Sequence, residues 1–110
     1  MTDVIIGGWI AGQGWRAGLA GSLLAGISGP GGLHYVGQVG SGFTELELRH
    51  LTTLLHSLST PTPPFTGAVP TGLARHAHWV HPVLRAEVAY TELTATGRLR
   101  QPVWRGLRPT

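Results

Sequence analysis

The sequence predicts an all-β fold with one helix, arranged as an OB-fold: a five-stranded Greek-key barrel with the helix between strands 3 and 4. Three β-like segments come first, one capped amphipathic segment follows, and two or three β-like segments complete the chain. A length of 110 residues suits one modest domain. We therefore expect a single domain over residues 1–110, with the barrel in 1–102, the helix at about 44–58 and a tail at 103–110.

The first half of the chain contains three predicted strands. They cover residues 4–10, 22–27 and 33–40. Gly7 and Gly8 lie inside the first of them and suggest a bulge, as small barrels need where a strand turns a corner. A glycine-rich loop over 11–21 and a strong turn signal over 28–32 separate the three segments.

One segment has the signature of a helix. Thr44 and Glu47 have the spacing of a capping box, which marks a helix start. A proline-rich stretch over 60–64 would end it. Between these signals, leucines at spacings of three and four form one apolar stripe: Leu48, Leu51, Leu55 and Leu58.

The remaining strands are predicted in the last third of the chain. They cover residues 77–81, 84–93 and 98–101. In the longest one the apolar side chains alternate with polar ones, which gives it one buried and one exposed face. The side chains expected to share the buried face are Leu84, Ala86, Val88 and Tyr90.

The positive charge of the chain is carried by arginine alone. Eight arginines and no lysines stand against five acidic residues, for a net charge of +3. The absence of lysine excludes Schiff-base chemistry and a lysyl-nucleotide intermediate on this polypeptide. Guanidinium groups match phosphate oxygens and stay protonated, so the set suits phosphate recognition. A GC-rich coding bias is the alternative explanation.

Cysteine and long apolar runs are both missing from the sequence. No cysteine means no disulfide, no thiolate metal ligand and no cysteine nucleophile. Glycine or a polar residue interrupts every apolar stretch before membrane-spanning length. We expect a cytoplasmic protein that has no membrane partner.

Four stretches resemble the OB domain of bacterial ATP-dependent DNA ligases, of the double-strand-break-repair and small stand-alone repair types. Together they cover nearly the whole chain with the family's spacing. They are Ile6-Gly7-Gly8-Trp9, Gly21 with the five residues after it, residues 35–43 (from Tyr35 to Phe43), and residues 87–108 (from Glu87 to Arg108).

The resemblance implies a division of labour between domains. In such ligases an adenylation domain carries the lysine that attacks ATP, and it holds most of the contacts to ATP and a divalent metal, Mg²⁺ or Mn²⁺. The OB domain closes over the nucleotide and then clamps nicked double-stranded DNA. We expect this chain to hold no cofactor itself, to partner nicked DNA and an adenylation domain in DNA repair, and to be inactive alone. It would be an excised domain or half of a split ligase.

The resemblance also assigns a site to Arg108. It falls at the arginine of the family's motif VI, Arg-x-Asp-Lys, which assists the departure of pyrophosphate. Thr110 stands where the aspartate is expected, and the sequence ends before the lysine. We expect Arg108 to be an accessory catalytic residue; a solvated arginine in the tail is the alternative.

Four other arginines are the expected DNA contacts: Arg16, Arg98, Arg100 and Arg105. In related ligases the loop around Arg16 projects onto DNA, so Trp15 beside it is a further expected contact. A loose linker between two strands is the alternative interpretation of that loop. Trp104 is expected to be a packing anchor rather than a stacking platform for bases.

Three histidines, His76, His78 and His81, have the look of a metal cluster. On an extended strand the first two share a face and the third points away, and no carboxylate is near in sequence. We therefore expect ordinary histidines and no metal site. A stand-alone, non-enzymatic module binding single-stranded nucleic acid or a protein partner is the rival function.

Overall fold

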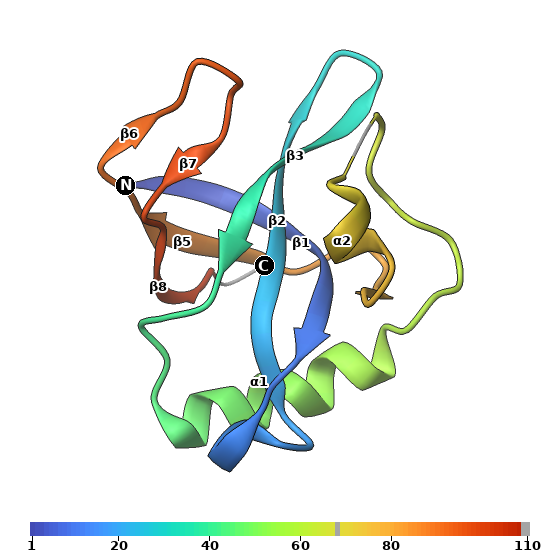
Figure 1. Ribbon diagram of the computed structural model, residues 1–110, viewed down its shortest axis with the longest axis vertical. Coiled ribbons are helices and arrows are strands. Elements are labelled where there is room, and N and C mark those ends of the chain that lie inside the picture. The colour runs from blue at the N-terminus through green and yellow to red at the C-terminus, as the bar shows by residue number, and fades with distance from the viewer. Residues whose placement is uncertain (68, 109–110) are drawn as a thin grey trace.

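The computed structural model describes residues 1–67 and 69–108, and it is built on one antiparallel sheet of six strands. Its order is β3-β2-β1-β5-β8, with β4 paired to β1, while β6 and β7 form a separate two-stranded sheet (Figure 1). The strands are β1 Thr2–Ala11, β2 Ala20–Gly29, β3 Gly32–Val39, β4 His78–Trp79, β5 Arg85–Ala89, β6 Glu92–Leu93, β7 Leu99–Arg100 and β8 Val103–Leu107. The helices are the 3-10 turn η1 Gly14–Arg16, the long helix α1 Glu45–Ser57 and the short α2 Thr71–Ala74.

The prediction of a mostly β protein with one substantial helix is confirmed. The strand count of the described residues exceeds the five expected, because the predicted strand over 84–93 is divided in two and the predicted tail contributes a further strand. In Figure 1, α1 runs across one end of the sheet, and the β6–β7 hairpin stands at the far end. Among the described residues, no helix has both the length and the apolar character needed to cross a membrane.

Strand β1 organises the sheet, since it pairs with β2, β4 and β5. The predicted bulge is present: its register with β2 shifts between Ile6 and Gly8. A Cβ on Gly7 would lie 2.5 Å from the ring of Phe65. Glycine is therefore required where Phe65 packs closely against the strand.

Helix α1 closes one side of the main hydrophobic core. Thr44 caps it, its hydroxyl accepting a 3.1 Å hydrogen bond from the backbone N–H of Glu47, as the capping signal predicts. Its stripe of Leu48, Leu51 and Leu55 is fully buried against the inner face of the sheet. Packing of this apolar stripe against the sheet therefore stabilises the helix, as is usual for amphipathic helices.

A second, smaller core lies on the outer face of β2 and β3. Leu24, Leu33, Tyr35 and Phe65 form it, and the segment 69–79 packs against it through Val69, Leu73, Ala77 and Trp79. That segment contains α2, which was expected to be a loop. The predicted strand over 77–81 is reduced to β4, and it starts later than predicted because the backbone N–H groups of residues 76 and 77 still donate to the carbonyls of Leu73 and Ala74 in α2.

The predicted strand over 84–93 is divided into β5 and β6. Its first half pairs with β1 and β8, while its second half pairs with β7. Gln101 has φ 52°, a left-handed conformation, and Pro102 has no N–H to offer a ladder. The segment that pairs with this strand therefore kinks between β7 and β8, and the hydrogen-bond ladder is interrupted opposite Tyr90.

The predicted C-terminal tail is wrong for residues 103–107, which form β8. Trp104 is the reason: its side chain is 2% exposed and stacks on Phe43, with ring centroids 5.0 Å apart. Its backbone N–H also donates to the carbonyl of Ser41. Trp104 is thus the packing anchor that was predicted, and it holds the end of the chain against the sheet.

Candidate nucleic-acid interface

The 12–19 loop between β1 and β2 places Arg16 against the end of β3. Its Nη1 donates to the carbonyl oxygens of Gly21, at 2.9 Å, and Gly40, at 3.1 Å. Its guanidinium also lies over the rings of Trp15 and Phe43. The loop is therefore tied to the sheet by this side chain rather than being a loose linker.

Trp15 is the most exposed aromatic side chain among the described residues, at 61% exposure. Its ring is therefore accessible for contact with a partner. The neighbouring guanidinium lies 5.2 Å from the ring centroid. An exposed indole beside a cation is the pairing that single nucleic-acid strands use for stacking and charge.

Arg98 contacts β3 from the β6–β7 hairpin. Leaving the β6–β7 hairpin, it donates from Nη1 to the carbonyl of Tyr35, at 3.0 Å, and lies 4.9 Å from the Tyr35 ring centroid. Burial raises the pKa of the Tyr35 hydroxyl, and the nearby Arg98 opposes part of that rise. The structure thus brings Arg16 and Arg98 to one edge strand, β3, from two loops far apart in sequence.

Between these two arginines the outer face of β2 and β3 carries polar side chains. The amide nitrogen of Gln38 donates to the hydroxyl of Ser22 across the two strands, at 2.6 Å. Gln38 is exposed and Ser22 is buried. This polar strip, together with Trp15, Arg16 and Arg98, is called the β3 surface below.

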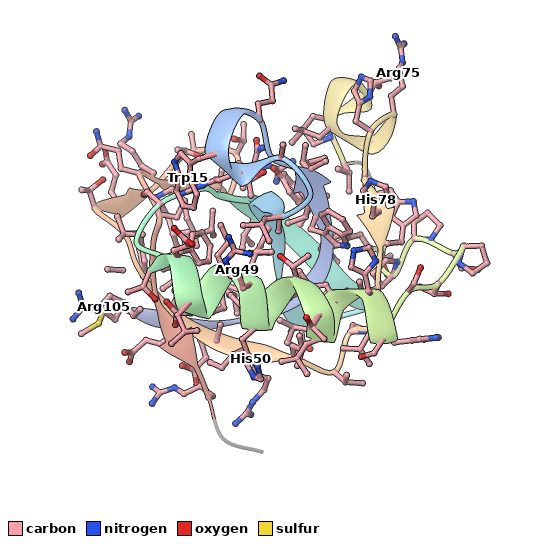
Figure 2. The ribbon with its side chains drawn as sticks, turned by 90° about the horizontal axis from the view of Figure 1, so that it is seen from below. Trp15, Arg49, His50, Arg75, His78 and Arg105 are labelled. Carbon is pink, nitrogen blue, oxygen red and sulfur yellow. The ribbon has the colours of Figure 1, made fainter. Side chains whose placement is uncertain are left out.

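The other two expected DNA contacts lie elsewhere. Arg100 is bound to Glu92 by a 2.8 Å ion pair within the β6–β7 hairpin. Arg105 is exposed on β8, and Figure 2 shows it at the edge of the molecule away from His78. The structure therefore does not gather the four predicted arginines in one place.

Arg108 follows β8, which lies at the other end of the strand order from β3, and it makes two ion pairs there. Its Nε donates to the Asp3 carboxylate at 2.9 Å, and its Nη2 donates to the Glu87 carboxylate at 2.9 Å. The two carboxylates belong to directly paired residues of β1 and β5. Hydrogen bonding and charge from Asp3 raise the pKa of Arg108, with Glu87 adding to the effect. Residue 110, where the motif departs, lies outside the described residues.

The ion pairs also decide which arginines remain available to a partner. Arg49, Arg100 and Arg108 pair with four of the five carboxylates. In the part of the chain that is described, no ion pair is present for the other five arginines: Arg16, Arg75, Arg85, Arg98 and Arg105. Arg75 and Arg85 were not among the DNA contacts expected from the sequence, because nothing in the local pattern distinguishes them from other exposed arginines.

The three histidines are separated by the fold. His76 and His78 line one cleft beside α2, while His81 is exposed and does not line it. The His78 ring is stacked on Trp9, with centroids 4.3 Å apart. Among the described residues, no group of three or more His, Cys, Asp or Glu side chains is placed to hold a metal ion.

Comparison with known proteins identifies relatives of the whole fold. Residues 16–110 match the family model of the ATP-dependent DNA ligase C-terminal region. The multifunctional non-homologous end joining protein LigD of Mycolicibacterium smegmatis is 51% identical over 107 residues, which are 97% of this chain and 14% of that protein. The chain thus spans about one seventh of this relative.

Two solved structures are similar over the same region. The ligase domain of LigD from Mycobacterium tuberculosis is 50% identical with a TM-score of 0.91, and the match covers 97% of this chain and 34% of that one. A mycobacterial DNA ligase D in complex with ATP and MES is 50% identical with a TM-score of 0.84, at the same coverage.

Proposed function

Because this chain belongs to the family of ATP-dependent DNA ligase C-terminal regions, we propose that it is an OB-fold domain that clamps nicked double-stranded DNA and assists adenylation of a catalytic domain. The proposal treats residues 1–110 as one domain. Its parent is a ligase of bacterial DNA repair, working in the cytoplasm where the chromosome lies. ATP and Mg²⁺ or Mn²⁺ are held mostly by the adenylation domain.

The meeting of Arg16 and Arg98 on β3 carries the DNA-binding half of this proposal. In OB-folds the face of strands 2 and 3 and the loops that frame it bind oligonucleotides. Here those positions correspond to the strip of Gln38 and Ser22, the loop with Trp15, and the β6–β7 hairpin. Each guanidinium keeps further N–H groups for phosphate oxygens, since arginine has five donors.

Arg108 carries the adenylation half of the proposal. A guanidinium next to departing pyrophosphate stabilises the negative charge that develops there. In the structure its Nε and Nη2 are bound to Asp3 and Glu87. We propose that domain closure exchanges one of these carboxylates for a phosphate oxygen, because a cluster of one cation and two anions would otherwise repel the nucleotide.

A binding titration tests the DNA half. The chain should bind a nicked duplex weakly and with little sequence preference, because phosphate contacts position a protein without reading bases. The double variant Arg16→Ala/Arg98→Ala should lose affinity about tenfold or more, equivalent to about 1.4 kcal/mol. Arg49→Ala, which removes a guanidinium already paired with Glu45 on an exposed helix, is the matched control.

Two outcomes would contradict the assignment. Unchanged affinity in the double variant, with circular dichroism showing an intact fold, would remove the β3 surface from the interface. Tight binding to one single-stranded sequence, with no response to nicked duplex, would instead support a stand-alone single-strand-binding module.

A further inference from the structure

A cleft lies beside α2. Its volume is about 410 Å³, and its lining includes Ile10, Gln13, Gly72, Leu73, His76 and His78. These residues come from the end of β1, the loop after it, and the stretch from α2 to β4. Nothing in the proposed roles of Arg16, Arg98 or Arg108 uses this cleft.

The walls of the cleft combine apolar and neutral polar groups. Ile10 and Leu73 are half-buried and present aliphatic surface, while Gln13, His76 and His78 are exposed. An amide and two imidazoles can each both donate and accept hydrogen bonds. Stacking on Trp9 fixes the plane of the His78 ring. A cavity of this size and mixture is typical of a site for one small organic group.

The charges around the cleft favour an anionic occupant. None of the acidic residues of the chain, all of them described in the structure, lines it. Arg75 directly precedes His76, and Figure 2 shows Arg75 and His78 on the same side of the molecule. Arg75 is exposed, so its guanidinium is accessible from solvent.

We propose that this cleft binds one unpaired nucleotide of a DNA strand. Its base lies against Ile10 and Leu73 and meets Gln13 and an imidazole at its polar edge, while its phosphate faces Arg75 and His76. The volume admits a base with its sugar but not a stacked duplex, so a single-stranded end is the part of DNA that fits. The proposal rests on the proposed DNA-binding function and extends it to unpaired ends.

The test compares a short blunt duplex with the same duplex carrying a single-stranded overhang. The chain should bind the overhang form about tenfold more tightly, equivalent to one contact of about 1.4 kcal/mol. Gly72→Leu should abolish that difference and leave blunt-duplex binding unchanged. A Cβ at Gly72 meets no atom within 4 Å, and its φ is not left-handed, so the variant should fold with a narrowed cleft.

Further variants and spectra make the test specific. His76→Ala should reduce the overhang preference, whereas His50→Ala is the control. His50 is an exposed histidine on α1, outside the cleft, and lies well away from His78 in Figure 2. In NMR spectra the side-chain amide of Gln13 and the ring of His76 should shift when the overhang duplex is added.

Each result separates the two proposals. Equal affinity for both duplexes, or shifts confined to Trp15 and Arg16 with none at Gln13 and His76, would overturn the cleft proposal and leave duplex binding standing. Absence of binding to either duplex would overturn the proposed DNA-binding function together with the cleft.

Discussion

At the scale of single residues, the arginines differ in what already occupies their donors. Arg108 has two carboxylate partners, whereas Arg16 and Arg98 bond to backbone carbonyls and aromatic rings. A carboxylate is an anion, as phosphate is, so it competes for a guanidinium far more strongly than a neutral carbonyl oxygen does. Under the proposed function, Arg16 and Arg98 can therefore accept a phosphate without losing a carboxylate partner, whereas Arg108 must exchange one.

Arg108→Ala should separate two steps of ligation when an adenylation domain is supplied in trans or in fusion. The rate of enzyme–AMP formation should fall about 10²-fold, the loss typical of one charge-stabilising donor. Sealing of a pre-adenylated nick should change much less, because pyrophosphate has already left. Radiolabelled ATP and single-turnover sealing measure the two rates, and the chain alone, which lacks lysine, should stay unlabelled.

Arg85→Ala is the control for that comparison, since it removes an exposed arginine from the same strand that holds Glu87. Equal losses in both steps for Arg108→Ala would identify it as a DNA or packing residue. The motif VI assignment would then be abandoned.

Tyr35 should make the free energy of unfolding depend on pH in the alkaline range. Its folded pKa is raised above the ordinary value of 10.0, chiefly by burial, so ionisation is harder in the folded state. Its contribution to stability is therefore complete below pH 10 and is lost as pH rises through the folded pKa. Urea unfolding above pH 10 should show this loss, and Tyr35→Phe should remove that part of it. An identical pH dependence in both proteins would contradict the assignment.

At the scale of elements, the start of α1 rests on one side chain. Thr44→Ala removes the acceptor for the Glu47 N–H and should lower the free energy of unfolding by about 1 kcal/mol. Thr53→Ala is the matched control in the same helix. Its hydroxyl bonds back to the carbonyl of Arg49 in an exposed turn, so its removal should be nearly neutral. Equal losses in chemical denaturation would mean that the cap contributes nothing.

The loop before α1 meets β8 at a glycine. Gly42 has φ +97°, and a Cβ there would collide with the backbone of Trp104. Gly97 has φ +79° with no atom within 4 Å of a Cβ, so Gly97→Ala measures backbone strain alone, about 1–2 kcal/mol. Gly42→Ala should cost clearly more in a denaturation experiment. Similar costs would show that the loop moves aside freely.

At the scale of the whole molecule, ion pairing sets how many arginines can meet phosphate. Five lie outside the ion pairs of the described residues, which suggests ~3–5 phosphate contacts and a log–log salt slope of about −3 to −4. Arg16→Ala should reduce the slope by about 1, whereas Arg49→Ala should leave it unchanged. Anisotropy titrations across a salt series measure both. A slope near zero would mean that charge does not drive the binding.

The sequence by itself determined the features that depend on neighbours along the chain. The start of α1 follows from Thr44 and Glu47, three residues apart, and the bulge in β1 follows from Gly7 and Gly8. Burial of Trp104 was also foreseeable, because a large apolar ring is stabilised mainly by leaving water. Family membership rests on motifs of the same local kind.

Only the tertiary structure decided what joins distant segments. Asp3 and Arg108 are 105 positions apart, and their ion pair arises because β1 and β8 both flank β5. Tertiary structure likewise brings Arg16 and Arg98 to β3 from two separate loops. It also brings Gln13 and His76 to the two sides of one cleft. Strand register and partner choice are fixed by side-chain packing across the whole sheet, so no local pattern specifies which distant residues will meet.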